Sequence, residues 1–172
     1  KKVITLCLVA LLAWSFMFSV WTRELFNFWV LMAISSGVLA GAALFFNNKD
    51  KCKLFTFKKS HIFIGLASAL VVYIIFWIGK NVSTYIFSFA GSQIEAIYRN
   101  KEGAAPLVIG LLLFFLIGPA EEIFWRGFVQ FRLSERFGEN RGWIYSTVIY
   151  AGVHIASWNF MLISTAFVCG II

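Results

Sequence analysis

Residues 104–118 read AAPLVIGLLLFFLIG, and residues 119–133 continue as PAEEIFWRGFVQFRL. The first stretch contains no charged residue, and the second places Glu121, Glu122 and Arg126 among apolar and aromatic residues. Ionised side chains are costly at hydrocarbon depth, so they occur there mainly where they are paired or hydrated and serve a function. The two stretches together predict a membrane-embedded helix that carries a reactive polar group.

The composition of the whole chain predicts a polytopic helical membrane protein. Hydrophobic residues make up 60% of the 172 residues and charged residues 13%, which excludes an ordinary soluble domain and a disordered chain. The long unbroken apolar runs exclude a transmembrane β-barrel, whose strands alternate in polarity. The net charge of +7 lies in short loops, which favours the lipid bilayer and not nucleic acid as the partner. We therefore expect an all-α bundle of transmembrane helices.

The three cysteines, Cys7, Cys52 and Cys169, are widely spaced. Two of them lie inside apolar runs, so they predict neither a disulfide framework nor a zinc motif. They are best interpreted as small apolar side chains that fill space.

Three apolar stretches precede the segment quoted above, over residues 3–21, 26–46 and 62–79. Each is about the length of a helix that crosses a bilayer. The loop 47–61 contains five lysines and one aspartate, so it is expected in the cytoplasm, and the N-terminus with it. Residues 80–103 are mixed in character and predict an interfacial or external segment with some helix.

Residues 104–118 are short for a crossing, and we expect the helix to continue through residues 119–137. Pro119 is expected to bend this helix or to begin a new one at its first turn. The charged stretch 132–141 predicts a second cytoplasmic turn, with Gly138 ending the helix.

Residues 143–157 return into the membrane, and Trp158-Asn159 are expected to break the helix. Residues 160–172 begin another apolar helix, which at about 13 residues is too short to cross. The first residue is also not Met. We therefore expect a piece of a longer protein, with a helical bundle that is truncated at the C-terminus.

The turn at Gly138 permits a geometric prediction. Glu121 lies 17 residues before it and His154 lies 16 residues after it. With a rise of about 1.5 Å per residue, two antiparallel helices would place both side chains roughly 25 Å from the turn. The acid and the histidine are therefore expected at matching depth, facing one another across a hydrated pocket.

Helical spacing separates the roles of the two acids. Glu122 and Arg126 are four residues apart and can form an ion pair in the favoured orientation. Glu121 is rotated by about 100° on the helix and points elsewhere. We expect the pair to be a charge-neutralising clamp and Glu121 to be the general base that activates a water.

Tyr150 and His154 share a helix face in the same way. His154 is expected to orient the water with Glu121, to ligate a metal, or to donate to an oxyanion. Tyr150 is expected to stack on His154 or to hydrogen-bond with it. For His154 alone, a plain hydrogen bond between helices is an equal alternative, and for Glu122 with Arg126 the alternative is an internal salt bridge. The tryptophans near the ends of the spans are interpreted as interface anchors, namely Trp21, Trp77 and Trp143.

The spacing Glu121-Glu122-x-x-x-Arg126, followed by Tyr150-x-x-x-His154, resembles the CPBP family, the CAAX-protease and bacteriocin-processing (Abi) intramembrane proteases. That family's first motif is E-E-x-x-x-R and its second is F-x-x-x-H, where this chain has Tyr150 in place of Phe. Its third motif, H-x-x-x-N or a variant, normally lies one or two helices further on, after the point where this sequence ends.

The resemblance covers residues 104–172 and implies hydrolysis of a peptide bond within or beside the membrane. It implies that Glu121 activates the water, that Glu122 and Arg126 hold Glu121 in place, and that His154 assists at the same water. Residues 1–172 are then a single transmembrane domain, with N-terminal helices and loops over 1–103 and an incomplete catalytic core over 104–172.

The implied partners are the bilayer and a membrane-associated peptide or protein substrate, of bacteriocin, pheromone or CAAX-like type. The expected location is the bacterial cell membrane. Glu121 and His154 are a small ligand set beside the three protein ligands usual for catalytic zinc. We therefore expect no cofactor, with a divalent metal such as zinc as the alternative.

Two other functions fit the same residues. A non-catalytic immunity or scaffold protein would retain the family fold and bind membrane partners. A transporter or proton relay would also bury an acid and a histidine, but the first three apolar stretches supply almost no ionisable groups for a continuous polar path.

Overall fold

The computed structural model describes residues 1–19, 22, 25–47 and 58–172. Over these residues it contains helices and turns and no strand, which confirms the all-α prediction. The helices are, in chain order, α1 (Lys2–Phe18), α2 (Phe28–Phe46), α4 (Lys59–Ile86), α5 (Ala90–Tyr98), the 3-10 helix η1 (Arg99–Gly103), α6 (Pro106–Leu112), the π-helical η2 (Leu113–Ile117), α7 (Gly118–Phe124), the π-helical η3 (Trp125–Gln130), α8 (Phe131–Phe137), α9 (Glu139–Gly152), the 3-10 helix η4 (Ile155–Ser157) and α10 (Phe160–Ile171).

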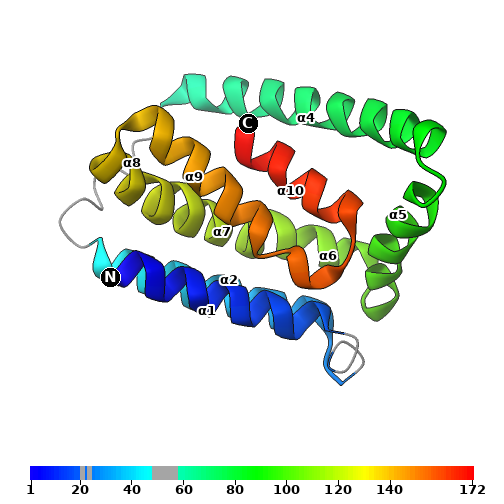
Figure 1. Ribbon diagram of the computed structural model, residues 1–172, viewed down its shortest axis with the longest axis horizontal. Helices are drawn as coiled ribbons and strands as arrows, with labels where there is room; N and C mark the ends of the chain where they lie inside the picture. The colour runs from blue at the N-terminus through cyan, green and yellow to red at the C-terminus, as the bar shows by residue number, and fades with distance from the viewer. Residues whose placement is uncertain (20–21, 23–24, 48–57) are drawn as a thin grey trace.

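The helices form three layers (Figure 1). On one side α1 and α2 lie next to each other, and α2 packs on α7. The middle layer contains the run from α6 to α8, together with α9 and α10, which pack on each other. On the opposite side α4 contains no buried residue, and it returns to the rest of the molecule through α5.

Three helical runs in the described part of the chain are long and apolar enough to cross a membrane, over residues 28–46, 59–86 and 106–137. The apolar helices α1 and α10 are shorter. The start of α1, the start of α4 and the turn between α8 and α9 lie at the same end of the molecule (Figure 1). This grouping is consistent with the expectation that these basic segments share one side of the membrane. The basic residues 48–57, with Cys52, lie outside the described residues, as does Trp21.

The third apolar stretch is longer than predicted. It was expected to end at Gly79, with an interfacial segment following, but α4 begins at Lys59 and continues to Ile86. The polar residues after Gly79 satisfy their side chains within the helix, because the Thr84 hydroxyl donates to Lys80 O at 2.8 Å. Such back-bonding lets an otherwise polar turn remain helical. The rest of the stretch expected to be interfacial forms α5 and η1.

Pro119 lies in the first turn of α7, as one of the two predicted alternatives placed it, although the helical run around it is unbroken. The run is continuous from Pro106 to Phe137 and contains the π-helical segments η2 and η3, one on each side of α7. A proline inside an α-helix has no N–H to donate, and its ring crowds the carbonyl of the preceding turn. A wider π turn in front of it relieves this crowding. At Gly118 a Cβ would lie 2.7 Å from Leu113 O, so the wide turn requires glycine there.

The predicted stop at Gly138 is confirmed. Its φ of +87° lies in the region that favours glycine, and α9 begins at the next residue, four positions before the predicted Trp143. The C-terminal end of this predicted helix also differs, because α9 ends at Gly152 and not at Ser157. The predicted break follows, with Trp158 at φ 51° and the Asn159 side chain accepting from Leu162 N–H at 2.9 Å.

The hairpin of α8 and α9 depends on a close approach at Gly142. A Cβ on this residue would overlap the backbone and the hydroxyl of Ser134. We expect Gly142→Ala to destabilise the protein by about 1–3 kcal/mol, the cost of overpacking a tight contact. The matched control is Gly65→Ala, since Gly65 lies on α4 with nothing within 4 Å of such a Cβ. Thermal unfolding in detergent measures both, and an equal midpoint for the two variants would contradict the prediction.

A buried aromatic cluster joins the first layer to the middle layer. Its largest members are Trp14 of α1 with Phe124, Trp125 and Phe128 of the long run, and each is at most 1% exposed. At the edge of this cluster the buried Asn47, which follows α2, donates to Gly127 O at 2.8 Å. The N-terminal helices thus pack directly against the segment that carries the two acids.

Candidate active site

Glu121 lies in α7, between the two π-helical segments, and its carboxylate contacts α9. The hydroxyl of Tyr150 donates to Glu121 Oε2 at 3.1 Å. The Tyr150 ring packs against Trp125, with 5.1 Å between ring centroids. The acid is therefore held against α9 by a tyrosine whose ring is itself packed. Because a carboxylate accepts several hydrogen bonds, its other oxygen has capacity for a water.

The predicted ion pair is present. Arg126 Nη1 lies 3.3 Å from Glu122 Oε1, and the two side chains are 28% and 61% exposed. The same guanidinium donates from Nη2 to Cys169 O in α10, and its Cζ lies 5.3 Å from the centroid of the Tyr150 ring. Arg126 therefore connects the motif helix to both α10 and α9, in addition to neutralising Glu122.

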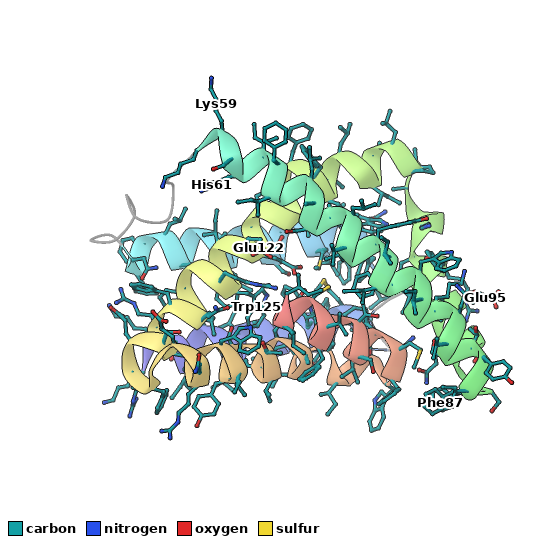
Figure 2. All side chains as sticks on the ribbon, turned by 90° about the horizontal axis from the view of Figure 1, so that it is seen from above. Lys59, His61, Phe87, Glu95, Glu122 and Trp125 are labelled. Atoms are coloured by element: carbon teal, nitrogen blue, oxygen red, sulfur yellow. The ribbon has the colours of Figure 1, made fainter. Side chains whose placement is uncertain are left out.

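Glu122 and Trp125 lie on different parts of the motif segment. In Figure 2, Trp125 lies nearer to α9 and α10 than Glu122 does. Trp125 is 0% exposed, whereas Glu122 is the more exposed member of its ion pair. The two acids have different partners, Tyr150 for Glu121 and Arg126 for Glu122, which agrees with their predicted separation, since neighbouring residues on a helix point about 100° apart.

His154 is bound through both ring nitrogens. Its Nε2 accepts from the indole N–H of Trp14 at 3.2 Å, and its Nδ1 lies 2.9 Å from Tyr150 O. An indole nitrogen only donates and a carbonyl oxygen only accepts. The ring is therefore neutral, with its proton on Nδ1. Its ring contacts with Tyr150 confirm that these two aromatic side chains meet, at 5.4 Å and an interplanar angle of 86°.

The predicted direct pairing of Glu121 with His154 is not present, because each of the two side chains contacts Tyr150 instead. Glu121 contacts Tyr150, four residues before His154 in the chain, so the contact lies one helical turn nearer to Gly138 than expected. His154 itself lies after the end of α9, where its N–H bonds to Ala151 O at 3.1 Å. A direct role of His154 at the same water as Glu121 stays a prediction. In this arrangement the histidine reaches the acid through Tyr150.

Two contributions to the site were missed in the sequence. Trp14 and the carbonyl of Cys169 approach from α1 and α10, and no local spacing connects them to the motif. The one available signal was the position of Trp14 in the middle of an apolar helix, because tryptophans that anchor a helix lie at its ends. The predicted anchors Trp77 and Trp143 are 60% and 37% exposed.

An open hollow of about 420 Å³ lies beside Arg126, between η3, α8 and α9. Its polar lining includes Gln130, Ser134 and Asn140. The hollow lies toward the end of the molecule where α8 turns into α9. A polar hollow of this size holds many water molecules, so Arg126 adjoins space that water can fill.

The donor set does not fit a catalytic zinc site. No group of three His, Cys, Asp or Glu side chains that could hold a metal occurs among the residues that the structure describes. Of the two candidate ligands, Glu121 accepts from Tyr150, and His154 has both nitrogens in hydrogen bonds. A metal at His154 Nε2 would have to displace the indole N–H of Trp14.

The comparisons with known proteins find a family match for the C-terminal part of the sequence. Residues 103–172 match the model of the family described as type II CAAX prenyl endopeptidase Rce1-like. This segment, less than half of the chain, is similar to that family and is called the Rce1-like segment. The match confirms the resemblance to CPBP proteases that the motif spacing predicted. The Rce1-like segment contains Glu121, Arg126, Tyr150 and His154, whereas Trp14 lies outside it. No curated protein and no solved structure matches the chain significantly.

Proposed function

We propose that the protein is an intramembrane endopeptidase in which Glu121 activates the attacking water. The observation that carries the proposal is the placement of Glu121 in a helical run apolar enough to cross a membrane. The neighbouring acid, Glu122, forms the ion pair with Arg126. Because Arg126 pairs with Glu122, the carboxylate of Glu121 can still accept a proton from water. The Rce1-like match of the surrounding segment supports peptide hydrolysis as the reaction.

The proposed reaction needs one base and one water. Glu121 accepts a proton from water through the oxygen that does not bind Tyr150, and the water oxygen bonds to the carbonyl carbon of the scissile peptide. The C–N bond then breaks, and the proton held by Glu121 passes to the leaving nitrogen. A base within hydrogen-bond reach of the water is the requirement for this chemistry. The products are a new carboxylate and a new amine.

Tyr150 and Arg126 orient the base. Tyr150 holds Oε2 of Glu121, and Arg126 lies against the Tyr150 ring while it binds Glu122 and α10. Rigid packing of the groups around a reacting side chain lowers the cost of reaching the reactive geometry. We propose that Glu122, Arg126 and His154 serve Glu121 in this way, through the contacts described above.

We propose a membrane-associated peptide as the substrate, of CAAX-like, bacteriocin or pheromone type, in a bacterial cell membrane with the N-terminus in the cytoplasm. The test uses the intact protein in liposomes. One probe is a prenylated peptide that ends in Cys-aliphatic-aliphatic-X, and the other is the same peptide without the prenyl group. Cleavage of the prenylated peptide, seen by mass spectrometry, is the expected result. If neither peptide, nor a panel of hydrophobic leader peptides, is cut, the proposal is wrong.

Removal of the Tyr150 hydroxyl is expected to slow cleavage. Tyr150→Phe keeps the ring contacts with Trp125 and His154 but loses the hydrogen bond to Glu121. A hydrogen bond to a charged group contributes about 1.5–3 kcal/mol, so we expect kcat to fall roughly 10- to 100-fold. Tyr145→Phe is the matched control, because Tyr145 lies on the same helix, is 42% exposed and packs against Phe137. Equal rates for the two variants would remove Tyr150 from the mechanism.

A non-catalytic membrane partner is the second candidate function. The observation that favours it is the binding of both His154 nitrogens to protein atoms, including one from another helix. Such contacts are what a purely structural histidine makes. Under this alternative, a Glu121→Gln variant would keep its full biological activity. Under the proposed function it would lose that activity together with cleavage.

A further inference from the structure

Trp14 is the residue of the first helix that contacts the proposed catalytic segment through a polar group. Its indole N–H donates to His154 Nε2 at 3.2 Å across 140 positions of sequence. Trp14 is 1% exposed and His154 is 7% exposed. A buried indole N–H needs a partner, and here the partner is an imidazole nitrogen. The contact therefore joins α1 to the turn that follows α9.

The two hydrogen bonds of His154 fix its tautomer and its orientation together. Nε2 accepts from Trp14, so the proton must lie on Nδ1, which donates to Tyr150 O. The ring is also enclosed by Trp14 at 6.3 Å and Phe18 at 6.1 Å between centroids. The other tautomer would place an N–H against the Trp14 N–H and an unprotonated nitrogen against the carbonyl, and a flipped ring would place a C–H at each position. Trp14 thus selects one of the possible states of this side chain.

The orientation of His154 matters because of the carbonyl that it binds. Tyr150 O belongs to the last turn of α9, where a continuing helix would offer it the N–H of residue 154. That N–H bonds to Ala151 O, and the imidazole supplies the donor for Tyr150 O in its place. The side chain of the same tyrosine binds Glu121. One hydrogen-bonded path therefore runs from Trp14 through His154 and Tyr150 to Glu121.

We infer that Trp14 is a positioning residue, which orients His154 and through it the tyrosine that binds Glu121. This inference rests on the proposed function for its effect on rate. It assigns to α1, which lies outside the Rce1-like segment, a part in the reaction beyond anchoring the chain. The indole acts through another side chain and does not touch the water.

The experiment compares Trp14→Phe with Trp29→Phe in the intact protein. Trp29 Nε1 also donates a hydrogen bond, to Asn100 O at 2.8 Å, but this bond joins α2 to η1 and includes no residue of the motif. Both variants lose one indole N–H and keep an aromatic ring. With the prenylated peptide as probe, we expect Trp14→Phe to lower kcat roughly three- to tenfold at unchanged KM, the effect of one neutral hydrogen bond. Trp29→Phe is expected to cleave at the wild-type rate.

A spectroscopic readout separates positioning from a general loss of stability. Residues 1–172 contain two histidines, His61 and His154, and the ring signals of His154 in the ¹⁵N-histidine spectrum are assigned by their loss in His154→Gln. His61 lies at the start of α4 and is the internal reference. We expect His154 to be a single Nδ1–H tautomer in the wild type and a mixture of tautomers in Trp14→Phe. If Trp14→Phe does not fold, β-(3-benzothienyl)alanine at position 14 keeps the bicyclic shape and replaces the N–H with sulfur.

The outcomes are distinct. An unchanged His154 tautomer in the position 14 variant, or a kcat equal to that of Trp29→Phe, overturns the inference. Cleavage that persists undiminished in Glu121→Gln overturns the proposed function instead. In that case the histidine spectrum still decides whether Trp14 orients His154.

Discussion

A Glu121→Gln variant is expected to lose at least about 10³-fold in kcat, within the range that a general base contributes. Glutamine has nearly the same shape and still accepts a hydrogen bond from the Tyr150 hydroxyl, so the 3.1 Å contact can persist. What it lacks is a site that takes a proton from water. The measurement is cleavage of the prenylated peptide by the intact protein, with folding checked by the thermal unfolding midpoint.

Two further variants sharpen this prediction. Glu122→Gln removes the charge that pairs with Arg126 but leaves Glu121, and we expect it to retain far more activity than Glu121→Gln. Glu135→Gln changes an exposed carboxylate that pairs with Arg132 at 2.8 Å, and it is expected to cleave normally. If the Glu121 and Glu122 variants lost activity equally, the assignment of one acid as base and the other as clamp would be wrong.

An Arg126→Ala variant is expected to lose both activity and stability. The guanidinium binds Glu122, donates to Cys169 O and lies over the Tyr150 ring. Its removal leaves Glu122 without this cation and α10 without its link to the motif helix. Loss of one partner of a low-dielectric ion pair costs about 3–5 kcal/mol when the pair is fully buried. Because this pair is partly exposed, we expect less than that, together with a roughly 10²-fold lower kcat as Tyr150 loses its packing.

Arg126→Lys separates charge from geometry. Lysine keeps the positive charge near Glu122 but has no planar fork to reach a carboxylate and a carbonyl at once. We expect it to recover most of the stability and little of the rate. Arg132→Ala is the control, because the Arg132–Glu135 pair lies on α8 away from Tyr150. Full cleavage by both Arg126 variants would show that the arginine does not position the site.

The order of the helices could be predicted because their signals are local. The second apolar stretch was expected at residues 26–46 and forms α2, where Asn27 accepts from Val30 N–H and determines the start. The turn at Gly138 and the break at Trp158 were also expected. In the structure both residues have a positive φ. The end of α9 at Gly152 was missed, and there the carbonyl of Tyr150 in the last turn binds the side chain of His154.

Within the site too, contacts within one helix could be predicted, and contacts between helices could not. The ion pair of Glu122 with Arg126 follows from a spacing of four residues on one helix, and the structure contains it. The sequence also predicted that Glu121 lies at about the same depth as a residue of the helix after Gly138. This prediction followed from counting residues from Gly138 in both directions. The sequence did not predict that the contacting residue is Tyr150, because the exact depth of each residue depends on where α9 begins and ends.

The amino-acid sequence alone determined that this is a helical membrane protein with an ionisable motif inside an apolar run, because hydrophobicity, helical periodicity and glycine stops act over a few residues. Only the tertiary structure decided which groups meet that motif. Trp14 is 140 positions from His154, and Cys169 is 43 positions from Arg126. Contacts between distant segments depend on the packing of whole helices, and an apolar helix can present any of its faces to its neighbours until a core has formed.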